Sequence, residues 1–450
     1  MRPDGDDCDL LIEGAHILTA DAARREIPHG RIGTTGNRIA FIEAADARTA
    51  PMAGTVIDAA GCIVVPGFIN THTHAVLSLM RGVAEDMGFA PAYTKGVPRA
   101  PMITEEEAVA LARLGALEAL KFGSTAICDT YVHPLNTMPA MGALGLRIFG
   151  CNLLHDVDFA GMPKGRWDYD EAIGEARLAE VFALHENCHG GENGRLQVIM
   201  APHAPDTCST AFLKKVAEAN ERLGLRTAIH LAQSDIEVQR IAARDRRTPV
   251  ELIDQVGLLN DRLLAAHCIK LTETDIKRAG DARIHVAHVP KGNAGGGMIA
   301  PTDRLRAAGA NLTLSTDNLL ADMTEGMRWA LSIARLQTET VNSDWQPEHV
   351  FEMATINGAR ALGMTDEIGS LEPGNMADIV IVNADTPHLT PRLDALGALV
   401  HCGQGSNVRD VIVDGEVVVR DGQAARADET AIMAEAQAAA EALWARARAG

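Results

Sequence analysis

Two histidines two positions apart stand at the end of an apolar run near the start of the chain. In "FINTHTH", His72 and His74 are separated by one threonine. Alternate residues of a strand point to the same side, so both imidazoles can face one metal ion. The spacing alone fits two polar residues at a strand end equally well. Its interpretation therefore depends on the residues that end the other apolar runs.

Two further residues of metal-ligand type end later runs. His230 lies in "TAIHL" and Asp317 ends "LTLSTD". Three imidazoles and one carboxylate suit a borderline divalent cation that keeps one position open for water. A single buried histidine is more often a packed core residue, and an aspartate after a strand is often a helix cap. Four coincident run ends favour a metal site instead. The run "LQVIMAPHAP" ends without the acid or lysine that would bridge two metals, which predicts a single ion.

Three more histidines close apolar runs. They are His203 in "APHAP", His267 in "LAAHC" and His288 in "VAHVP". None is needed as a ligand, so we expect His203 and His267 to orient the substrate or to polarise the oxygen on the attacked carbon. The alternative for each is a packed, hydrogen-bonded imidazole, and His288 fits either that or a residue that supports the ligands. The other ten histidines, His155 among them, show no such combination and are expected to be structural or solvated.

Eight apolar runs must position these residues, and amphipathic segments lie between them. The runs cover residues 62–74, 124–131, 146–155, 196–205, 226–234, 263–271, 283–290 and 311–318. Parallel strands that are buried on both faces read as continuous apolar runs. The pattern predicts an α/β fold in which eight strands alternate with helices as a (β/α)8 TIM barrel. Activity in such barrels sits at the carboxyl ends of the strands, which is where the histidines and Asp317 fall.

The two ends of the chain have a different character. Residues 1–66 and 371–450 carry strand-like pieces without helices between them, apart from an Ala-rich tail that reads as a closing helix. We expect both ends to form one small β-sandwich with a C-terminal helix, and residues 67–370 to form the catalytic barrel.

Composition limits the possible partners. The formal net charge of −19 would repel a phosphate backbone, and no block of Lys and Arg with interleaved aromatics occurs, so nucleic acid is not expected as a partner. No signal peptide and no apolar stretch long enough for a membrane span are found in the sequence, which predicts a cytoplasmic protein without a membrane partner. The eight cysteines show no CxxC pairing and are expected to be reduced thiols. These features favour an enzyme that acts on a small molecule.

Motifs along nearly the whole chain resemble one enzyme superfamily. They include "VPGFINTHTH", "APHAPDTCS", "IHLAQSDIEV", "LAAHCIKLT", "VAHVPKGN" and "STDN", and they run in order from about residue 8 to residue 422. Together they resemble the amidohydrolase superfamily, and more closely the branch that holds S-adenosylhomocysteine/methylthioadenosine deaminases and triazine hydrolases.

The resemblance implies a function for each site residue. His72, His74, His230 and Asp317 would hold one zinc or ferrous ion, and Asp317 would accept a proton from the water that the metal activates. His267 would stabilise the tetrahedral intermediate and His203 would contact the substrate. Arg147, in "GLR", is a further candidate for substrate contact, with an exposed charge between helix and strand as its alternative. The resemblance to this family also leads us to expect a homo-oligomer.

One position departs from the family pattern. Deaminases of this branch usually read His-Leu-Ala-Glu where this chain has Gln233, and that glutamate protonates the ring and the leaving amine. A glutamine can donate and accept hydrogen bonds but cannot release or take up a proton. The motifs "STDN" and "KGNAGGG" depart as well. We therefore expect Gln233 to be one of the catalytic residues, with Asp317 and His267, and to contact the substrate.

Three functions remain open from the sequence. The first is hydrolytic deamination, or displacement of a related leaving group, on an aminated heterocycle such as a purine, pterin, pyrimidine or triazine. The second is hydrolysis of another C–N bond, in a lactam, amide, carbamate or guanidino group, where no acid is needed to protonate a ring. The third, a catalytically silent binding barrel, conflicts with the intact ligand set.

Overall fold

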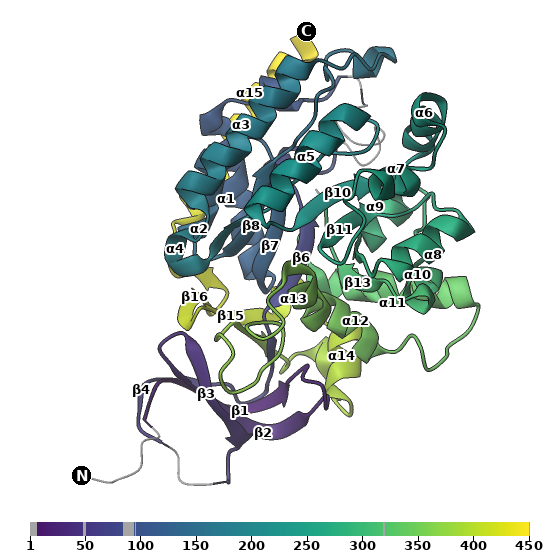
Figure 1. The fold of residues 1–450 in the computed structure, drawn as a ribbon. Coiled ribbons are helices and arrows are strands. Elements are labelled where there is room, and N and C mark those ends of the chain that lie inside the picture. The colour runs from purple at the N-terminus through teal and green to yellow at the C-terminus, as the bar shows by residue number, and fades with distance from the viewer. Residues whose placement is uncertain (1–6, 48–50, 84–93, 95, 318–319, 450) are drawn as a thin grey trace.

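Strands from both ends of the chain form one hydrogen-bonded sheet, at the lower end of Figure 1. The computed structural model describes residues 7–47, 51–83, 94, 96–317 and 320–449. The strands of this sheet are β1 (Cys8–Leu18), β2 (Glu26–Thr35), β3 (Arg38–Ala44), β4 (Ala53–Asp58), β5 (Cys62–Pro66), β14 (Ile379–Asn383), β15 (Val408–Val413), β16 (Glu416–Arg420) and β17 (Gln423–Ala424). Their order is β17-β16-β15-β14-β5-β1-β2-β3, and β4 pairs with β1.

The two ends meet where β14 runs antiparallel to β5, with Ile379 opposite Pro66. Alternating apolar residues of both ends, such as Ile12, Ile32 and Ile412, are buried in one shared cluster. A sheet built from both termini agrees with the prediction from the sequence. Its pairing differs from the expected sandwich, because β1 bonds to β2 on one side and to β4 and β5 on the other and so joins all nine strands into one connected sheet.

The centre of the molecule consists of two four-stranded parallel sheets. The first contains β6 (Phe68–Thr73), β7 (Ser124–Tyr131), β8 (Arg147–Asn152) and β9 (Leu196–Val198), and the second contains β10 (Thr227–Leu231), β11 (Leu263–His267), β12 (His285–His288) and β13 (Asn311–Leu314). Every residue of six of these strands is buried, as expected for parallel strands covered on both faces. The eight strands fall in the eight predicted runs.

Backbone hydrogen bonds connect the two parallel sheets at both of their edges. Met200, just after β9, forms a parallel bridge with Thr227 of β10, and its N–H donates to the carbonyl of Arg226 at 2.8 Å. At the other edge Thr73 of β6 forms a parallel bridge with Asp317, just after β13. The first and the last of the eight strands therefore lie side by side at their carboxyl ends.

Helices follow the parallel strands and cover them, as Figure 1 shows. They are α1 (Glu105–Lys121), α2 (Pro134–Gly142), α3 (Glu171–Cys188), α4 (Gly191–Gly194), α5 (Thr210–Leu223), α6 (Asp235–Asp245), α7 (Pro249–Gln255), α8 (Glu273–Asp281), α9 (Pro290–Gly295), α10 (Thr302–Ala308), α11 (Met323–Thr338), α12 (Pro347–Ala354), α13 (Ile356–Leu362), α14 (Ala395–Cys402) and α15 (Glu429–Ala449). Side-chain caps fix several of their starts. For example, the Ser209 hydroxyl accepts from the N–H of Phe212.

The C-terminal helix predicted from the Ala-rich tail is α15, and it lies along α1. Lys121 donates to the carboxylate of Glu429 at 2.5 Å, and Arg446 donates to Glu107 at 2.6 Å. The indole N–H of Trp444 donates to the carbonyl of Leu79 at 2.9 Å. The C-terminal helix thus packs on α1 and on the segment that follows β6.

The run "CIVVPGFINTHTH" divides between the terminal sheet and the core. Its first half is β5 and its second half is β6, and Gly67 lies between them. A Cβ atom at Gly67 would come within 2.0 Å of the Thr125 hydroxyl oxygen, so this close approach requires glycine. The change of sheet at Gly67 sets the direction in which β6 carries the first two histidines.

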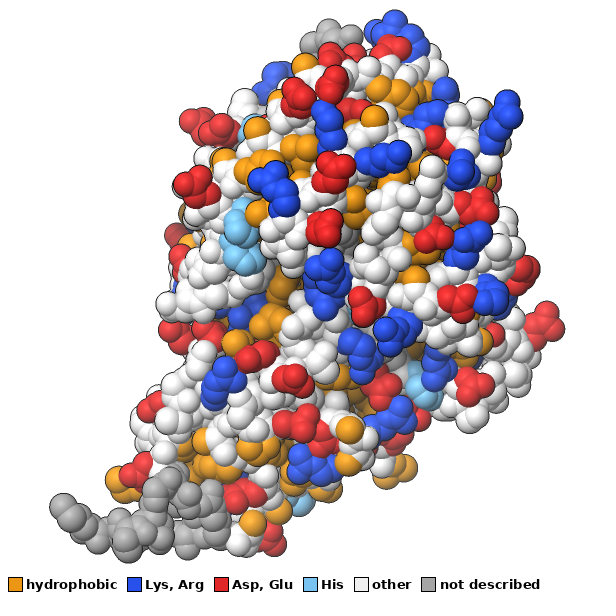
Figure 2. All heavy atoms as spheres, viewed as in Figure 1, with side chains coloured by type: hydrophobic (Ala, Val, Ile, Leu, Met, Phe, Trp, Pro, Cys, Tyr) orange, Lys and Arg blue, Asp and Glu red, His pale blue; other side chains and the backbone are white. Residues whose placement is uncertain are grey.

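The surface carries charges of both signs. Acidic and basic side chains are interspersed over the face in Figure 2, without a large block of one sign. None of the helices in the described ranges is long and apolar enough to cross a membrane.

Candidate metal centre and substrate site

The residues predicted as metal ligands meet at the carboxyl ends of the parallel strands. His72 lies in β6, His74 directly after it, and His230 in β10. Asp317 follows β13, and its backbone is tied to β6. Its N–H donates to the His72 carbonyl at 3.0 Å, and its own carbonyl accepts from the Thr73 hydroxyl at 2.9 Å. The bonds that join the last strand to the first therefore place the carboxylate beside the first two imidazoles.

Backbone carbonyls fix the tautomers of two of these histidines. The Nδ1–H of His74 donates to the carbonyl of Thr130 at 2.5 Å, and the Nδ1–H of His230 donates to the carbonyl of His203 at 2.7 Å. A carbonyl can only accept, so in the neutral rings both Nε2 atoms carry lone pairs. These two Nε2 atoms lie 3.3 Å apart. Two lone pairs at that distance repel one another unless a cation lies between them.

The third imidazole and the carboxylate complete the set. The Nε2 atom of His72 is buried without a hydrogen-bond partner and lies 3.9 Å from an Asp317 carboxylate oxygen, which is 3.6 Å from His74 Nε2. The ligand atoms of His72, His74 and His230 all lie within 4.8 Å of one another. Three imidazole nitrogens, of which those of His74 and His230 carry lone pairs, and one carboxylate form a donor set that fits a borderline divalent metal.

Burial keeps these imidazoles neutral. Desolvation lowers the pKa of His72 and His230 well below the usual range, and the neighbouring imidazoles act in the same direction. Desolvation also lowers the pKa of His74, against an opposing effect of the Asp317 carboxylate. Neutral rings are the form that binds metal.

Three residues around the centre have backbones in the left-handed region. The φ angles are 71° at His267, 60° at Asp317 and 50° at Ala232. A residue with a Cβ atom adopts this region at an energetic cost, and such strain concentrates at functional sites. Each of these residues lies where a parallel strand has just ended or is ending.

His267, the last residue of β11, lies next to the ligand set. Its Nε2 atom is 3.9 Å from the second carboxylate oxygen of Asp317, and its Nδ1–H donates to the Oδ1 atom of Asn293 at 3.0 Å. His267 therefore lies beside the predicted metal ligands. The sequence did not single out Asn293, which lies within the departing stretch "KGNAGGG".

His203 lies on another side of the centre and belongs to a small aromatic cluster. Its ring is 4.9 Å from the ring of His230, and its Nδ1 atom is 2.8 Å from the Thr207 hydroxyl. Phe159 meets His203 edge-on at 5.5 Å, and His155 stacks on Phe159 at 3.9 Å. The sequence assigned His155 no role, although it ends the third apolar run. A flat substrate next to His203 would meet this cluster.

Gln233 is buried in the loop after β10, and its backbone is held by a buried acid. The two carboxylate oxygens of Glu237 accept the N–H groups of Ala232 and Gln233, each at 2.8 Å. Burial, with the nearby Asp206 carboxyl, raises the pKa of Glu237 well above its usual range. Glu237 was not identified from the sequence, although its position four residues after Gln233 was a possible signal.

Arg147 is not part of this site. It is the first residue of β8, at the opposite end of the strand from the histidine cluster, and it is 1% exposed. Its guanidinium pairs with Asp378 at 3.2 and 3.4 Å and lies 3.7 Å from Asp414. The expectation of a substrate contact is corrected, because both carboxylates come from the part of the chain that builds the terminal sheet, and the interaction joins that sheet to the core.

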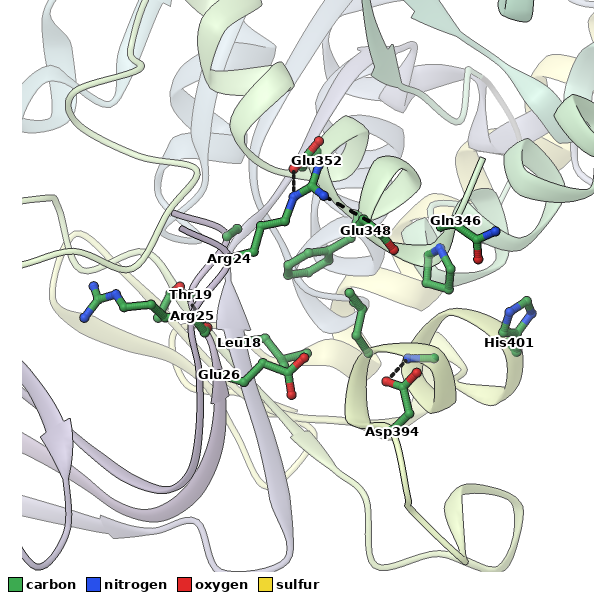
Figure 3. Close-up of a pocket in the computed structure, with 15 residues that line it drawn as sticks. Leu18, Thr19, Arg24, Arg25, Glu26, Gln346, Glu348, Glu352, Asp394 and His401 are labelled. Atoms are coloured by element: carbon green, nitrogen blue, oxygen red, sulfur yellow. Dashed lines mark hydrogen bonds and ion pairs between the residues drawn. The ribbon is translucent and has the colours of Figure 1, made fainter. Parts of the chain in front are cut away.

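A separate cavity of about 460 Å³ lies between the terminal sheet and helices α12 and α14 (Figure 3). Its charged side chains are largely paired with one another. Arg24 donates to Glu352 at 2.7 Å and lies 3.8 Å from Glu348, and the Asp394 carboxylate accepts from a backbone N–H of α14. None of the residues predicted for the metal centre lines this cavity.

Comparison with known proteins identifies the family and the fold. The description "Amidohydrolase family" matches residues 63–418, which is more than half of the chain. A 5'-deoxyadenosine deaminase of Methanosarcina mazei is 35% identical over 448 residues, covering 97% of this chain and 99% of that protein. A 5-methylthioadenosine/S-adenosylhomocysteine deaminase of Moorella thermoacetica is 33% identical and covers 91% and 94% of the two chains.

Solved structures give the same result for the fold. A zinc-bound adenosine deaminase from Xanthomonas campestris superposes with a TM-score of 0.88 at 25% identity, over 98% of this chain and 99% of that one. An atrazine chlorohydrolase from Arthrobacter aurescens, in complex with zinc, superposes with a TM-score of 0.84 at 22% identity, over 96% and 100%. One of these proteins is named as a deaminase and the other as a chlorohydrolase, and this chain shares the fold of both.

Proposed function

The chain belongs to the amidohydrolase family, and from that membership and the geometry of its site we propose that it is a metal-dependent hydrolytic deaminase of an aminated nitrogen heterocycle. The observation that carries the proposal is the convergence of three buried imidazoles and the Asp317 carboxylate on one point. Two relatives that match over nearly their whole lengths are named as deaminases of adenosine-type compounds, which supports the same class of reaction.

We assign the metal site to His72, His74, His230 and Asp317. Zinc is the ion we propose, because its preference for imidazole and carboxylate ligands fits this set and because the structural relatives hold zinc. Fe²⁺ is the alternative that metal analysis would distinguish. The two parallel sheets are hydrogen-bonded along both edges, and we infer that they form the closed (β/α)8 barrel typical of such sites.

Each residue of the site has a separate role in the proposed reaction. A bound divalent metal lowers the pKa of water and so supplies a nucleophile near neutral pH. Asp317 is placed to accept and hold a proton at this point, since one carboxylate oxygen lies 3.6 Å from His74 Nε2 and the other lies 3.9 Å from His267 Nε2. His267 holds the oxygen that adds to the attacked carbon. Gln233 would hydrogen-bond the ring but cannot transfer a proton, so Asp317 would deliver the proton to the leaving amine.

Gln233 also favours a second candidate function. A lactam, amide, carbamate or guanidino carbon is already polarised by its own heteroatom and needs no protonated ring nitrogen. A general acid contributes about 10²- to 10⁴-fold in rate, whereas the activated water is the nucleophile itself, so either reaction can proceed with a glutamine at this position.

Two measurements test the proposal. Elemental analysis should find about one divalent metal per chain, and His72→Ala should lose it, while His189→Ala, which changes an exposed histidine outside the site, should keep it. Two metals or none in the unmodified protein would contradict the mononuclear site.

The second measurement is a substrate panel. The panel should contain 5'-deoxyadenosine together with amino-substituted purines, pterins, pyrimidines and triazines, and amides and lactams as the competing class. Ammonia release with replacement of the amino group by oxygen in the product supports the deaminase. Turnover restricted to the amides and lactams would establish the second candidate instead. Gel filtration with light scattering would test the predicted homo-oligomer.

A further inference from the structure

Three buried polar atoms without partners belong to two residues that neighbour His267. Both ring nitrogens of His288 are buried without a hydrogen bond, and so is the Nδ2 atom of Asn293. Asn293 accepts from His267 with the other end of the same amide. Ala266 of β11 pairs with Ala287 of β12, so the residues that follow them, His267 and His288, lie at neighbouring positions of adjacent strands, and His288 is 1% exposed. These atoms therefore adjoin the reacting centre.

A comparison within the same strand shows how unusual this is. His285, three residues before His288 in β12, is also buried, but its Nε2–H donates to the carbonyl of Asp261 at 2.9 Å and its Nδ1 atom accepts from Asn311 at 2.8 Å. More than nine-tenths of buried polar groups have a partner, and leaving one unpaired costs about 1–3 kcal/mol. Three unpaired atoms on two residues next to His267 indicate that something outside the chain satisfies them.

The chemistry of the two side chains defines what that group must be. Burial lowers the pKa of His288 to about 3, with His267 acting in the same direction, so its ring is neutral near pH 7 and presents one N–H and one lone pair. Asn293 adds amide N–H groups and no charge. A neutral pair of this kind suits a neutral partner that offers both an acceptor and a donor, and it gives no compensation for a phosphate or carboxylate.

We propose that His288 and Asn293 form a substrate subsite that hydrogen-bonds an amide-like –NH–CO– edge of the heterocycle. The proposal rests on the proposed deaminase function and narrows its substrate class to heterocycles that carry an oxo group besides the amino group. Since Asn293 also holds His267, a substrate bound there is held next to the group that faces the attacked carbon.

Matched substrates isolate this edge. Isoguanine and adenine carry the same 6-amino group, and cytosine and 4-aminopyrimidine carry the same 4-amino group, but only the first member of each pair has the –NH–CO– edge. The unmodified protein should have a KM or Kd for the oxo member that is roughly 5- to 100-fold lower. His288→Leu should remove this preference. Asn293→Asp, which keeps an oxygen for the His267 N–H but replaces the free amide N–H, should weaken it.

A stability control separates recognition from a structural role. Leucine at position 288 removes unpaired polar atoms, so the urea midpoint of His288→Leu should equal or exceed that of the unmodified protein. His285→Leu leaves the partners of that ring unpaired and should lower the midpoint without changing the substrate preference. A drop in midpoint for His288→Leu as large as that for His285→Leu, with the substrate preference unchanged, would overturn the subsite.

Calorimetric binding of the same four compounds keeps the two proposals apart. If the oxo members bind more tightly and lose this advantage in His288→Leu while no compound of the wider panel releases ammonia, the deaminase function fails and the subsite stands. If ammonia is released but neither KM nor Kd favours the oxo members, the subsite fails and the deaminase function stands.

Discussion

Replacing Arg147 with methionine should destabilise the protein without changing its affinity for substrate. Arg147 and Asp378 have side chains 1% and 2% exposed, and two nitrogen–oxygen distances of 3.2 and 3.4 Å join them. Asp378 also accepts from the backbone N–H of Asp414 at 2.9 Å. Methionine fills much of the volume of the arginine chain but leaves the Asp378 carboxylate buried with its main cationic partner removed.

The size of the effect follows from that unpaired carboxylate. Removing one partner of a buried ion pair costs about 3–5 kcal/mol, whereas replacing both partners with apolar residues is often nearly neutral. Arg147→Met should therefore lower the free energy of unfolding by about 3–5 kcal/mol. The double variant Arg147→Met with Asp378→Leu should recover a large part of this loss, because no isolated buried charge remains at that pair.

Equilibrium urea unfolding, followed by circular dichroism, measures both variants, and a double-mutant cycle gives the coupling between the two positions. KM for the best substrate of the panel should be unchanged at urea concentrations where the variants are folded. A loss below about 1 kcal/mol for the single variant, or losses that simply add in the double variant, would refute a stabilising buried pair. A raised KM with an unchanged free energy of unfolding would instead indicate that Arg147 contacts the substrate.

Three further predictions concern single side chains. Gln233→Glu should raise or broaden deamination of amino-heterocycles in an ammonia-release assay. Burial beside Glu237 would keep the new carboxyl protonated, so that it could act as an acid. A rate no higher than that of the unmodified protein on every compound would contradict this prediction. Burial lowers the pKa of His285 from 6.5 to about 4, so the contribution of the neutral ring to stability is complete above pH 6.5 and is lost as the pH falls towards 4. Urea unfolding at each pH measures the difference in the free energy of unfolding between the unmodified protein and His285→Gln. This difference should shrink over that window by at most about 3 kcal/mol. Cys402 is the one exposed thiol among the eight cysteines, all of which lie in the described ranges. A thiol reagent should therefore label about one cysteine per native chain rapidly, and none in Cys402→Ser. Rapid labelling of several cysteines would contradict this and would show that the core opens readily.

Much of the candidate metal centre was predictable because its proposed ligands lie at the ends of regular elements. The strand period of two puts His72 and His74 on one side, and the carboxyl ends of parallel strands share one rim, so His230 and Asp317 could be assigned to the same point from their places at run ends. The structure brings these residues together, with His267 and His203 beside them.

The failures have a common physical origin. Arg147 also lies at a strand terminus, but at the amino end, where its partner Asp378 is 231 residues away in sequence. The pattern of one strand does not show which residue of a distant strand lies opposite its end. Asn293, Glu237 and His155 were missed for a similar reason, because each matters through a side chain or backbone group that only folding brings near.

The amino-acid sequence by itself determined three features: the residue types of the candidate metal ligands, the order of the eight buried strands, and the presence at position 233 of a glutamine, which cannot transfer a proton. All three are local properties of short segments. Only the tertiary structure decided the tautomers of His74 and His230, the role of Arg147 and the unpaired atoms of His288 and Asn293. Hydrogen bonding and burial depend on which atoms lie within about 3 Å of one another, and that distance is set by packing between segments far apart in the chain.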